Sequence, residues 1–223
     1  MIESQFEKCL KNPEDLKFLD KSSTFHFPRF QKLDLRVDSS IFLAFTEAIH
    51  GNTILREQNF SWNSMGDEGA THLAETLKTN SSIIKLNLSN ASFGTEGAVA
   101  LADTLKFNCS ISYIDLRNNA IGDNSIAALA ETLSFSLSIT TILLYFNSIG
   151  DEGAVALAKG LKSNSSVTLL DLQSNSITDK GAIALSKSLK CNSSVTHIKL
   201  QCNSITSKTR DIIQKMSFYR ISF

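Results

Sequence analysis

Two adjacent pairs of acidic residues, Asp67-Glu68 and Asp151-Glu152, have the side chains that general acid and base catalysis uses. Such catalysis requires one asymmetric group of residues around a substrate. These pairs instead occupy equivalent positions of a sequence repeat, just before a helical pattern of apolar residues. We therefore interpret them as residues at helix starts, and we predict no catalytic residue.

Histidine and cysteine are too dispersed to form a metal or nucleophile motif. The sequence contains no HExxH, CxxC, GxGxxG or P-loop motif. Cys109 and Cys191 lie almost three repeats apart, roughly 14 Å or more by strand spacing, which is too far for a disulfide bond. The sequence therefore predicts reduced thiols, no metal, no cofactor and no enzymatic activity. The remaining residues of these types are Cys9, Cys202, His26, His50, His72 and His197.

The composition is that of a folded chain without net charge. Of its 223 residues 42% are hydrophobic, which is enough to bury a core. The 22 Lys and Arg residues balance 22 Asp and Glu residues, so net charge gives no support for binding nucleic acid or an anionic membrane. No apolar stretch approaches the roughly 18 residues of a membrane span, and the N-terminus has no apolar signal segment. We expect a cytoplasmic protein that binds no nucleic acid and inserts into no membrane.

A 28-residue repeat organises the chain from about Leu55 onward, without an insertion. One apolar column contains Leu88, Leu116, Leu144, Leu172 and Leu200, and another contains Leu73, Leu101, Leu129, Leu157, Leu185 and then Ile213. A polar column contains Asn63, Asn119, Asn147, Asn175 and Asn203, and Ala91 is its one exception. We expect the amides of this polar column to hydrogen-bond to the backbone of a buried loop.

The hydrophobic period changes halfway through each repeat. Apolar and polar residues alternate around Ile114 and Leu116, which is typical of a short strand with one buried face. Residues 153–162 instead follow the three- and four-residue spacing of an amphipathic helix. We interpret Asp123 and its equivalents, which precede the helix, as N-caps. We interpret Asn164 and its equivalents, which follow the helix, as left-handed C-terminal caps.

A stack of such units must bend, because strands pack about 4.8 Å apart and helices need about 8–10 Å. The sequence therefore predicts an α/β fold, a right-handed βα solenoid with a parallel sheet on its concave face and helices on its convex face. We expect residues 1–29 to form an N-terminal helical cap and residues 30–216 to form about seven repeats, the first one shortened. We expect residues 217–223 to form an apolar C-terminal tail that caps the last repeat; the alternative is that this tail binds a partner.

The pattern of residues 111–121, IxxIxLxxNxI followed by a long helix, resembles the leucine-rich repeat in its 28-residue, ribonuclease-inhibitor-like form. The segments SIGDEGAVALAKGLKSNSSV and SITDKGAIALSKSLKCNSSV are similar to the repeats of NOD-like receptors and of many intracellular repeat proteins. The resemblance covers six units from Leu55 to about Met216. It implies the horseshoe fold of that family and recognition of a protein.

Strand residues that point away from the core form the concave face of such a solenoid. Three columns at this face do not follow the repeat, although the columns beside them do. In the middle of the arc these columns combine aromatic, aliphatic and charged residues, a composition that protein interfaces favour. We predict that a protein partner binds through Tyr113, Asp115, Arg117, Leu143, Tyr145, Phe146, Leu169, Asp171, Gln173, His197 and Lys199.

The sequence thus favours a non-enzymatic scaffold that binds a protein of unknown identity. The alternative is a regulator of another enzyme, similar to the leucine-rich Ran GTPase-activating proteins, although the acidic C-terminal tail of many of them is missing here. A GTP-turnover assay with candidate GTPases distinguishes the two functions. The sequence is compatible with a host protein and with an effector that a bacterium delivers into the host cytosol.

Overall fold

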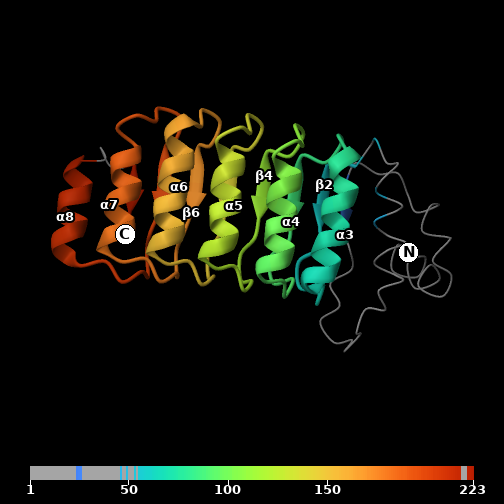
Figure 1. Ribbon diagram of the computed structural model, residues 1–223, viewed down its shortest axis with the longest axis horizontal. Coiled ribbons are helices and arrows are strands. Elements are labelled where there is room, and N and C mark those ends of the chain that lie inside the picture. The colour runs from blue at the N-terminus through green and yellow to red at the C-terminus, as the bar shows by residue number, and fades with distance from the viewer. Residues whose placement is uncertain (1–23, 27–45, 47–48, 50–52, 54, 217–219) are drawn as a thin grey trace.

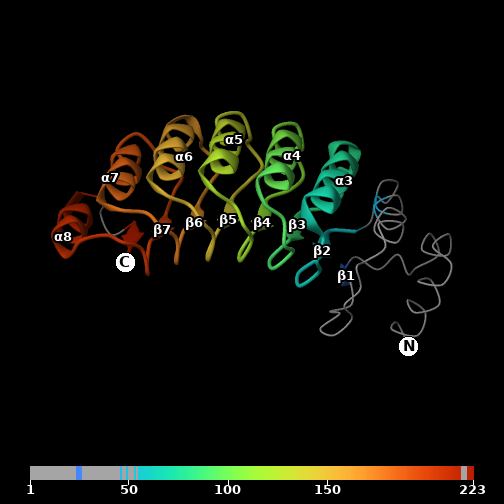
Figure 2. The ribbon, with the colours of Figure 1, turned by 60° about the horizontal axis from the view of Figure 1, so that its bottom comes forward.

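The computed structural model describes residues 24–26, 46, 49, 53, 55–216 and 220–223. Within these ranges strands and helices alternate along the chain and form an elongated, curved array (Figure 1). Figure 2 shows the helices on the convex side of the curve and the strands on the concave side. This arrangement is the predicted βα solenoid.

The elements keep the labels of Figure 1. The strands are β1 (Thr24–His26), β2 (Glu57–Asn59), β3 (Lys85–Asn87), β4 (Tyr113–Asp115), β5 (Thr141–Leu143), β6 (Leu169–Asp171), β7 (His197–Lys199) and β8 (Ile221–Ser222). The helices are α3 (Gly66–Thr79), α4 (Thr95–Leu105), α5 (Asp123–Leu133), α6 (Asp151–Ser163), α7 (Asp179–Ser188) and α8 (Ser207–Met216).

The described strands form one parallel sheet in which the spatial order is the sequence order, from β1 to β8. From β2 to β7 equivalent positions of successive repeats lie opposite each other, as in Ile114 opposite Ile142. The register changes at both ends. Thr24 lies opposite Glu57, which is more than one repeat away in sequence, and Ile198 lies opposite Ile221, which is less than one repeat away.

Both ends of the sheet lie in segments that the sequence assigns to terminal structures. Strand β1 lies within residues 1–29, where a helical cap is predicted; the other residues of that segment, and most of the predicted short repeat after residue 30, lie outside the described residues. In the tail, residues 217–219 are likewise outside them, and β8 adds the last strand. Ile221 of β8 is buried and packs in the core.

The core is a spine of apolar columns between the two layers. The strand-side column that runs from Leu88 to Leu200 is at most 4% exposed, and the helix-side column from Leu73 to Leu185 is equally buried. Burying one leucine side chain contributes about 1.5–3 kcal/mol. Because no repeat can bury this stripe alone, the columns join all repeats into one body.

The asparagine column at the strand exits bonds the loop backbone, as predicted. The side-chain amide of Asn147 donates to the carbonyl oxygens of Leu144 and Leu116, each at 3.1 Å. Its Oδ1 accepts from the backbone N–H of Ile121, at 3.2 Å. Each amide thus satisfies backbone groups of its own repeat and of the preceding one.

The predicted N-caps are corrected by the structure. Helices α5 and α6 begin at Asp123 and Asp151, but their N-cap positions are Gly122 and Gly150, which provide no side-chain hydrogen bond. The carboxylate of Asp123 instead accepts from the backbone N–H groups of Gly150 and Gly153, at 2.7 and 3.0 Å. Each aspartate therefore caps the helix of the following repeat, because its side chain projects across the repeat interface.

The predicted left-handed C-terminal caps are also wrong. Asn164 follows α6 with φ −78° and ψ 138°, which is an extended conformation. Its amide donates to the carbonyl oxygens of Leu133 and Ser136 in the preceding repeat, at 2.9 and 3.1 Å. At the end of the chain Arg220 occupies the equivalent position and donates in the same way, to Asn192 at 2.7 Å. Asn164 thus ends α6 in an extended conformation, and its side chain links the repeat to the preceding one.

Candidate functional site

From β2 to β7, the chain leaves each strand through a residue with left-handed backbone. These residues form one column with φ between 50° and 65°, and they are Trp62, Asn90, Asn118, Phe146, Ser174 and Cys202. Asparagine adopts this conformation readily, but for bulky side chains it is an outlier. The left-handed conformation costs an ordinary L-residue about 1–2 kcal/mol. The two aromatic residues of the column are therefore held in place by their surroundings at an energetic cost.

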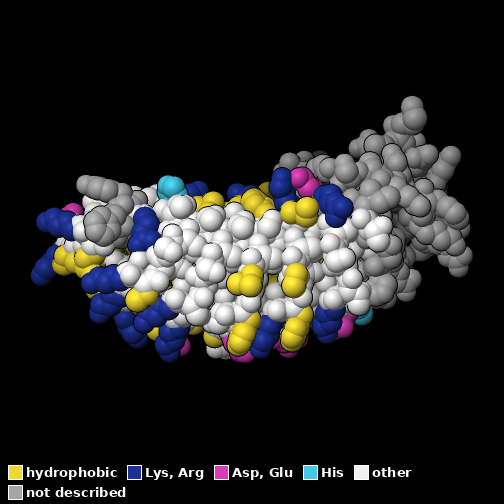
Figure 3. All heavy atoms as spheres, turned by 90° about the horizontal axis from the view of Figure 1, so that it is seen from above, with side chains coloured by type: hydrophobic (Ala, Val, Ile, Leu, Met, Phe, Trp, Pro, Cys, Tyr) yellow, Lys and Arg dark blue, Asp and Glu magenta, His cyan; other side chains and the backbone are white. Residues whose placement is uncertain are grey.

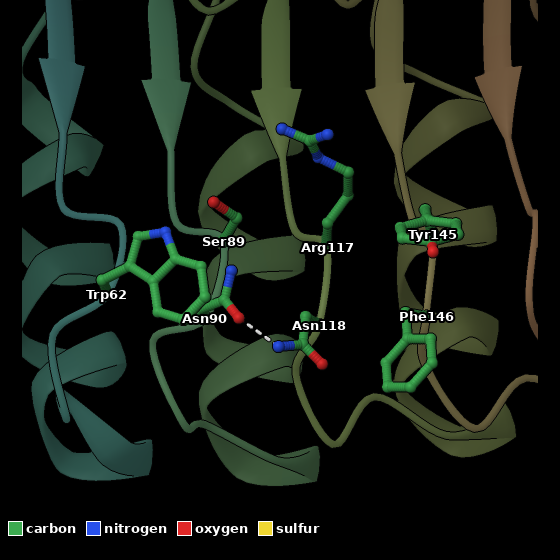
Figure 4. Close-up of a pocket in the computed structure, with 7 residues that line it drawn as sticks. All are labelled: Trp62, Ser89, Asn90, Arg117, Asn118, Tyr145 and Phe146. Atoms are coloured by element: carbon green, nitrogen blue, oxygen red, sulfur yellow. Dashed lines mark hydrogen bonds between the residues drawn. The ribbon is translucent and has the colours of Figure 1, made fainter.

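A groove of about 400 Å³ crosses the exits of β2 to β5 (Figure 4). Trp62 lies at one end of the groove and the neighbouring Tyr145 and Phe146 lie at the other. Between them, the amide of Asn118 donates to Oδ1 of Asn90. The lining is completed by Ser89 and Arg117. The groove thus combines aromatic ends with a polar middle.

The aromatic ends of the groove are accessible to solvent. Trp62 is 51% exposed, Tyr145 is 38% exposed and Phe146 is 56% exposed. The rings of Tyr145 and Phe146 lie 5.9 Å apart between centroids and are tilted by 45°. Aromatic rings provide large, rigid contact areas and are enriched at the energetic centres of protein interfaces.

Arg117 of the groove is held by a carboxylate on the concave face. Its Nε and Nη2 donate to Asp115 at 2.8 and 2.6 Å, and its backbone N–H also donates to Asp115 at 3.1 Å. The side-chain hydrogen bond with Asp115 raises the pKa of Arg117, so the guanidinium stays charged. Asp115 is 1% exposed, so its carboxylate holds Arg117 while it presents almost no surface of its own.

A second carboxylate is covered in the same way. Asp171 on β6 is 6% exposed and lies 3.2 Å from Nζ of Lys199 on β7. Leu143 lies between the two acidic residues in the sheet, with Asp115 as its pairing partner on β4 and Asp171 as its partner on β6. The half-buried Leu143 therefore forms an apolar centre between two ion pairs.

The other predicted concave residues occupy the starts of the strands. Tyr113 and Leu169 are half-buried and are separated by Thr141 in the register of the sheet. Burial, followed by the charge of Asp115, raises the pKa of Tyr113, so its hydroxyl stays protonated. His197 is exposed, with Nδ1 3.0 Å from the hydroxyl of the adjacent threonine. None of these residues, nor Tyr145 or the half-buried Gln173, belongs to the core.

A family model described as "Leucine Rich repeat" matches residues 51–74, 79–102, 107–130, 136–158 and 163–186. These matches cover more than half of the chain. The chain belongs to the leucine-rich repeat family. The matched repeats include every strand from β2 to β6 and the groove at their exits. The similarity to NOD-like receptor repeats is not tested by this match and stays a prediction.

Two solved structures share the fold of this leucine-rich repeat protein. A structure titled "Leiomodin-1 Actin-Binding Site 2 (ABS2)" has a TM-score of 0.54 and 19% identity, over 66% of this chain and 86% of the other. The tropomodulin C-terminal domain of Caenorhabditis elegans has a TM-score of 0.52 and 14% identity, over 69% of this chain and 92% of the other. A search of curated proteins finds no match. At these identities the likeness concerns the fold alone.

Sequence reasoning missed four residues that line the groove of the leucine-rich repeat protein, namely Trp62, Ser89, Asn90 and Asn118. Their contribution depends on the strand-exit loops, which the strand pattern does not describe. One signal was available, since the single tryptophan of the chain shares a column of the repeat with two asparagines, the residue type that favours left-handed backbone.

The described part of the leucine-rich repeat protein contains no cluster of three or more His, Cys, Asp or Glu side chains that could hold a metal ion. Cys109, Cys191 and Cys202 are exposed and not disulfide-bonded. None of the described helices is both long enough and apolar enough to cross a bilayer.

Proposed function

We propose that this leucine-rich repeat protein is a non-enzymatic scaffold that binds a protein partner through its concave face and the adjoining groove. The observation that carries this proposal is the left-handed column. Trp62 and Phe146 have large aromatic side chains in this column. Asparagine, which occupies the equivalent positions 90 and 118, adopts the left-handed conformation at lower energetic cost. A strained, exposed aromatic residue that faces a groove supports a binding role, because packing of the core does not account for it.

The concave face extends this surface. Arg117 connects the two regions, since it lines the groove and is anchored by Asp115 on the concave face. Next to it, Leu143 and Tyr145 provide the apolar centre of the surface. An apolar centre with Tyr and Arg and a polar surround is the usual composition of an energetically dominant interface region.

The groove favours an extended segment of the partner. Its aromatic ends suit apolar side chains of the segment, and the amides of Asn90 and Asn118 between them suit its backbone polar groups. Trp62 and Phe146 are separated by three strand spacings, roughly 14 Å, which an extended chain covers in about four or five residues.

A capture experiment from cell lysate tests this proposal. The wild type is compared with Tyr145→Ala and Trp62→Ala, which change opposite ends of the groove, and with Glu152→Ala, an exposed position at the start of α6. We expect a partner retained by the wild type and by Glu152→Ala to be lost by both groove variants. With the purified partner, Tyr145→Ala should weaken binding by about 2 kcal/mol.

Purified actin is a defined first probe, because the leiomodin-1 structure is titled as an actin-binding site. Actin cosedimentation that depends on Tyr145 would identify the partner. Every captured protein binding the groove variants as tightly as the wild type would contradict the proposed surface, provided that the variants melt at the temperature of the wild type.

A further inference from the structure

The edge of the solenoid opposite the groove is where helices end and strands begin. Its most exposed apolar side chains lie in two neighbouring repeats. Phe107 and Phe135 follow α4 and α5, and Leu137 lies two residues further on. They are 72%, 61% and 78% exposed. The other described repeats have smaller residues at the equivalent positions. Those equivalent to Phe107 and Phe135 are Thr79, Ser163 and Cys191. Those equivalent to Leu137 include Ser81, Ser165 and Ser193.

Lysines occupy the same edge in the next two repeats toward the C-terminus. Lys159 and Lys162 lie at the end of α6, and Lys187 and Lys190 lie at the end of α7; all four are exposed. Where α6 and α7 have Lys159 and Lys187, the earlier helices have acidic residues, Glu75, Asp103 and Glu131. Although the whole chain has no net charge, its charges are therefore segregated along this edge.

Figure 3 looks onto this edge. Hydrophobic side chains gather over the ends of α4 and α5, and Lys and Arg side chains gather beside them toward α8. Two of the nearby acidic residues are paired with lysines: Glu131 lies 2.8 Å from Lys106, and Glu75 lies 2.5 Å from Lys78. Lys106 also lies 4.9 Å from the ring centroid of Phe135. The apolar group thus lies beside positive charge on the same edge.

The whole-chain net charge predicts no membrane binding, but the local arrangement of this edge differs from the average. We propose that this edge docks on the surface of an anionic membrane, with Phe107, Phe135 and Leu137 inserted among the lipids. The three side chains protrude from loop tips and helix ends, and a fluid interface accepts such protrusions without a matching pocket. Exposed lysines attract anionic headgroups over distances of about a Debye length. Apolar insertion combined with basic residues is how peripheral proteins bind membranes reversibly.

Charge complementarity favours a lipid surface over a second copy of this chain. In a dimer built on this edge with two-fold symmetry, the same patch would face itself. Four exposed lysines of one copy would then approach those of the other. An anionic membrane instead attracts the lysines while it receives the apolar group, and it leaves the concave face on another side of the molecule free for a protein partner.

Vesicle cosedimentation tests the proposal. The wild type should bind vesicles of phosphatidylcholine mixed with phosphatidylserine, and it should bind vesicles of phosphatidylcholine alone much less. The variant Phe107→Thr/Phe135→Ser introduces the residues that neighbouring repeats have at the equivalent position, and it should reduce binding by roughly tenfold or more. Lys162→Glu/Lys190→Glu should reduce it by a similar factor and weaken its dependence on salt.

Tryptophan fluorescence locates the inserted edge. In a Trp62→Phe background, the single tryptophan of Phe107→Trp should shift to shorter wavelength on anionic vesicles and be quenched by lipids with brominated chains. Trp62 of the wild type lies in the groove at the opposite edge and should respond to neither. The control Tyr145→Ala alters only the groove and should bind vesicles like the wild type.

Three results would overturn the proposal. The first is equal binding of the wild type and Phe107→Thr/Phe135→Ser to anionic vesicles, when both proteins melt at the same temperature. The second is quenching of Trp62 together with no quenching of a tryptophan at position 107. The third is concentration-dependent dimerisation that the same double variant abolishes, without vesicle binding, which would assign the edge to a second copy.

Discussion

The interfaces between repeats and the concave surface differ in how strictly their residues recur every 28 positions. The interface residues recur, whereas the concave residues vary. Between repeats, Asp123 caps the backbone of Gly150 and Gly153, and in the next repeat Asp151 accepts from the N–H of Gly181 in the same manner, at 2.8 Å. On the concave surface, each column of equivalent positions contains at least four different residue types. A side chain that bonds the backbone of its neighbour must fit one fixed geometry, whereas a side chain that faces solvent has no such constraint.

One exception supports this reading of the repeat interface. Thr95 replaces the usual aspartate, and the position it would reach in the following repeat is Ser125 instead of glycine. In contrast, a Cβ at Gly153 would lie 2.6 Å from Oδ1 of Asp123. Glycine at position 153 therefore leaves room for the carboxylate of the preceding repeat. In α8 the equivalent residue is Thr209, whose hydroxyl instead hydrogen-bonds to the incoming carboxylate of Asp179.

The largest expected effect concerns two adjacent leucines, the concave Leu143 at the end of β5 and the buried Leu144 that follows it. Leu144→Ala removes a fully buried side chain of the spine and should reduce the free energy of unfolding by about 2–5 kcal/mol. Leu143→Ala changes the half-buried concave neighbour and should cost about 1 kcal/mol. Chemical denaturation of both variants measures the difference. Equal losses would remove the distinction between spine and surface.

A smaller effect is expected at the repeat interface. Gly153→Ala places a methyl group against the carboxylate of Asp123, so the structure must shift, and the free energy of unfolding should fall by about 1–3 kcal/mol. Gly122→Ala is the matched control, since nothing lies within 4 Å of its added Cβ, and it should change stability by about 0.5 kcal/mol or less. Equal urea unfolding of both variants would mean that the repeat interface accommodates the added methyl group.

The strand-exit column offers a test in which stability and binding change in opposite directions. Phe146→Asn relieves a left-handed aromatic residue and should raise the free energy of unfolding by about 1 kcal/mol, while it weakens partner binding. Asn118→Ala removes a residue type suited to this conformation and should lower stability. Thermal unfolding and the dissociation constant are measured for each. A destabilised Phe146→Asn would show that the ring contributes to folding rather than to recognition.

The smallest expected effect is the response of the repeat interface to acid. Burial acts to raise the pKa of Asp151, but hydrogen bonds from Thr178 and Gly181 outweigh it, and the folded pKa lies below its ordinary value. The stability that this carboxylate contributes is therefore complete above the unfolded pKa, about 3.9, and is lost as the pH falls toward the folded pKa.

Asp151→Asn removes this titration. Its free energy of unfolding should consequently depend less on pH than that of the wild type below about pH 4. Glu152→Asn, at the exposed neighbouring position, is the control and should keep the acid dependence of the wild type. Identical pH profiles for Asp151→Asn and the wild type would mean that the repeat interface does not stabilise the ionised form of Asp151 over its protonated form.

Much of the fold followed from periodicity, because apolar residues at a fixed spacing must share one buried spine. The columns from Leu88 to Leu200 and from Asn119 to Asn203 predicted the register of the sheet and the bonding of the loops. The role of Asp123 and the left-handed conformation of Asn164 were predicted incorrectly. Their spacing from the helices resembles that of caps, but their partners lie a full repeat away in the sequence, where local pattern gives no information.

For the site, the sequence identified the variable concave columns, whereas the structure added the groove. Arg117 and Tyr145 were found because their columns depart from the repeat, and Phe146 because it lies at the exit of the same strand. Trp62 was missed because the strand pattern does not describe the exit loops. The exposure of Phe107 next to lysines of other repeats likewise depended on the stacked arrangement.

The sequence by itself determined the solenoid, its register and the surface free to vary, because hydrophobic period and residue spacing act locally and repeat. Only the tertiary structure decided which carboxylate meets which helix, which acidic residues are covered and where the aromatic rings face. Those features arise from contacts between neighbouring repeats, whose geometry depends on the bend of the stack and on the left-handed turns that leave each strand.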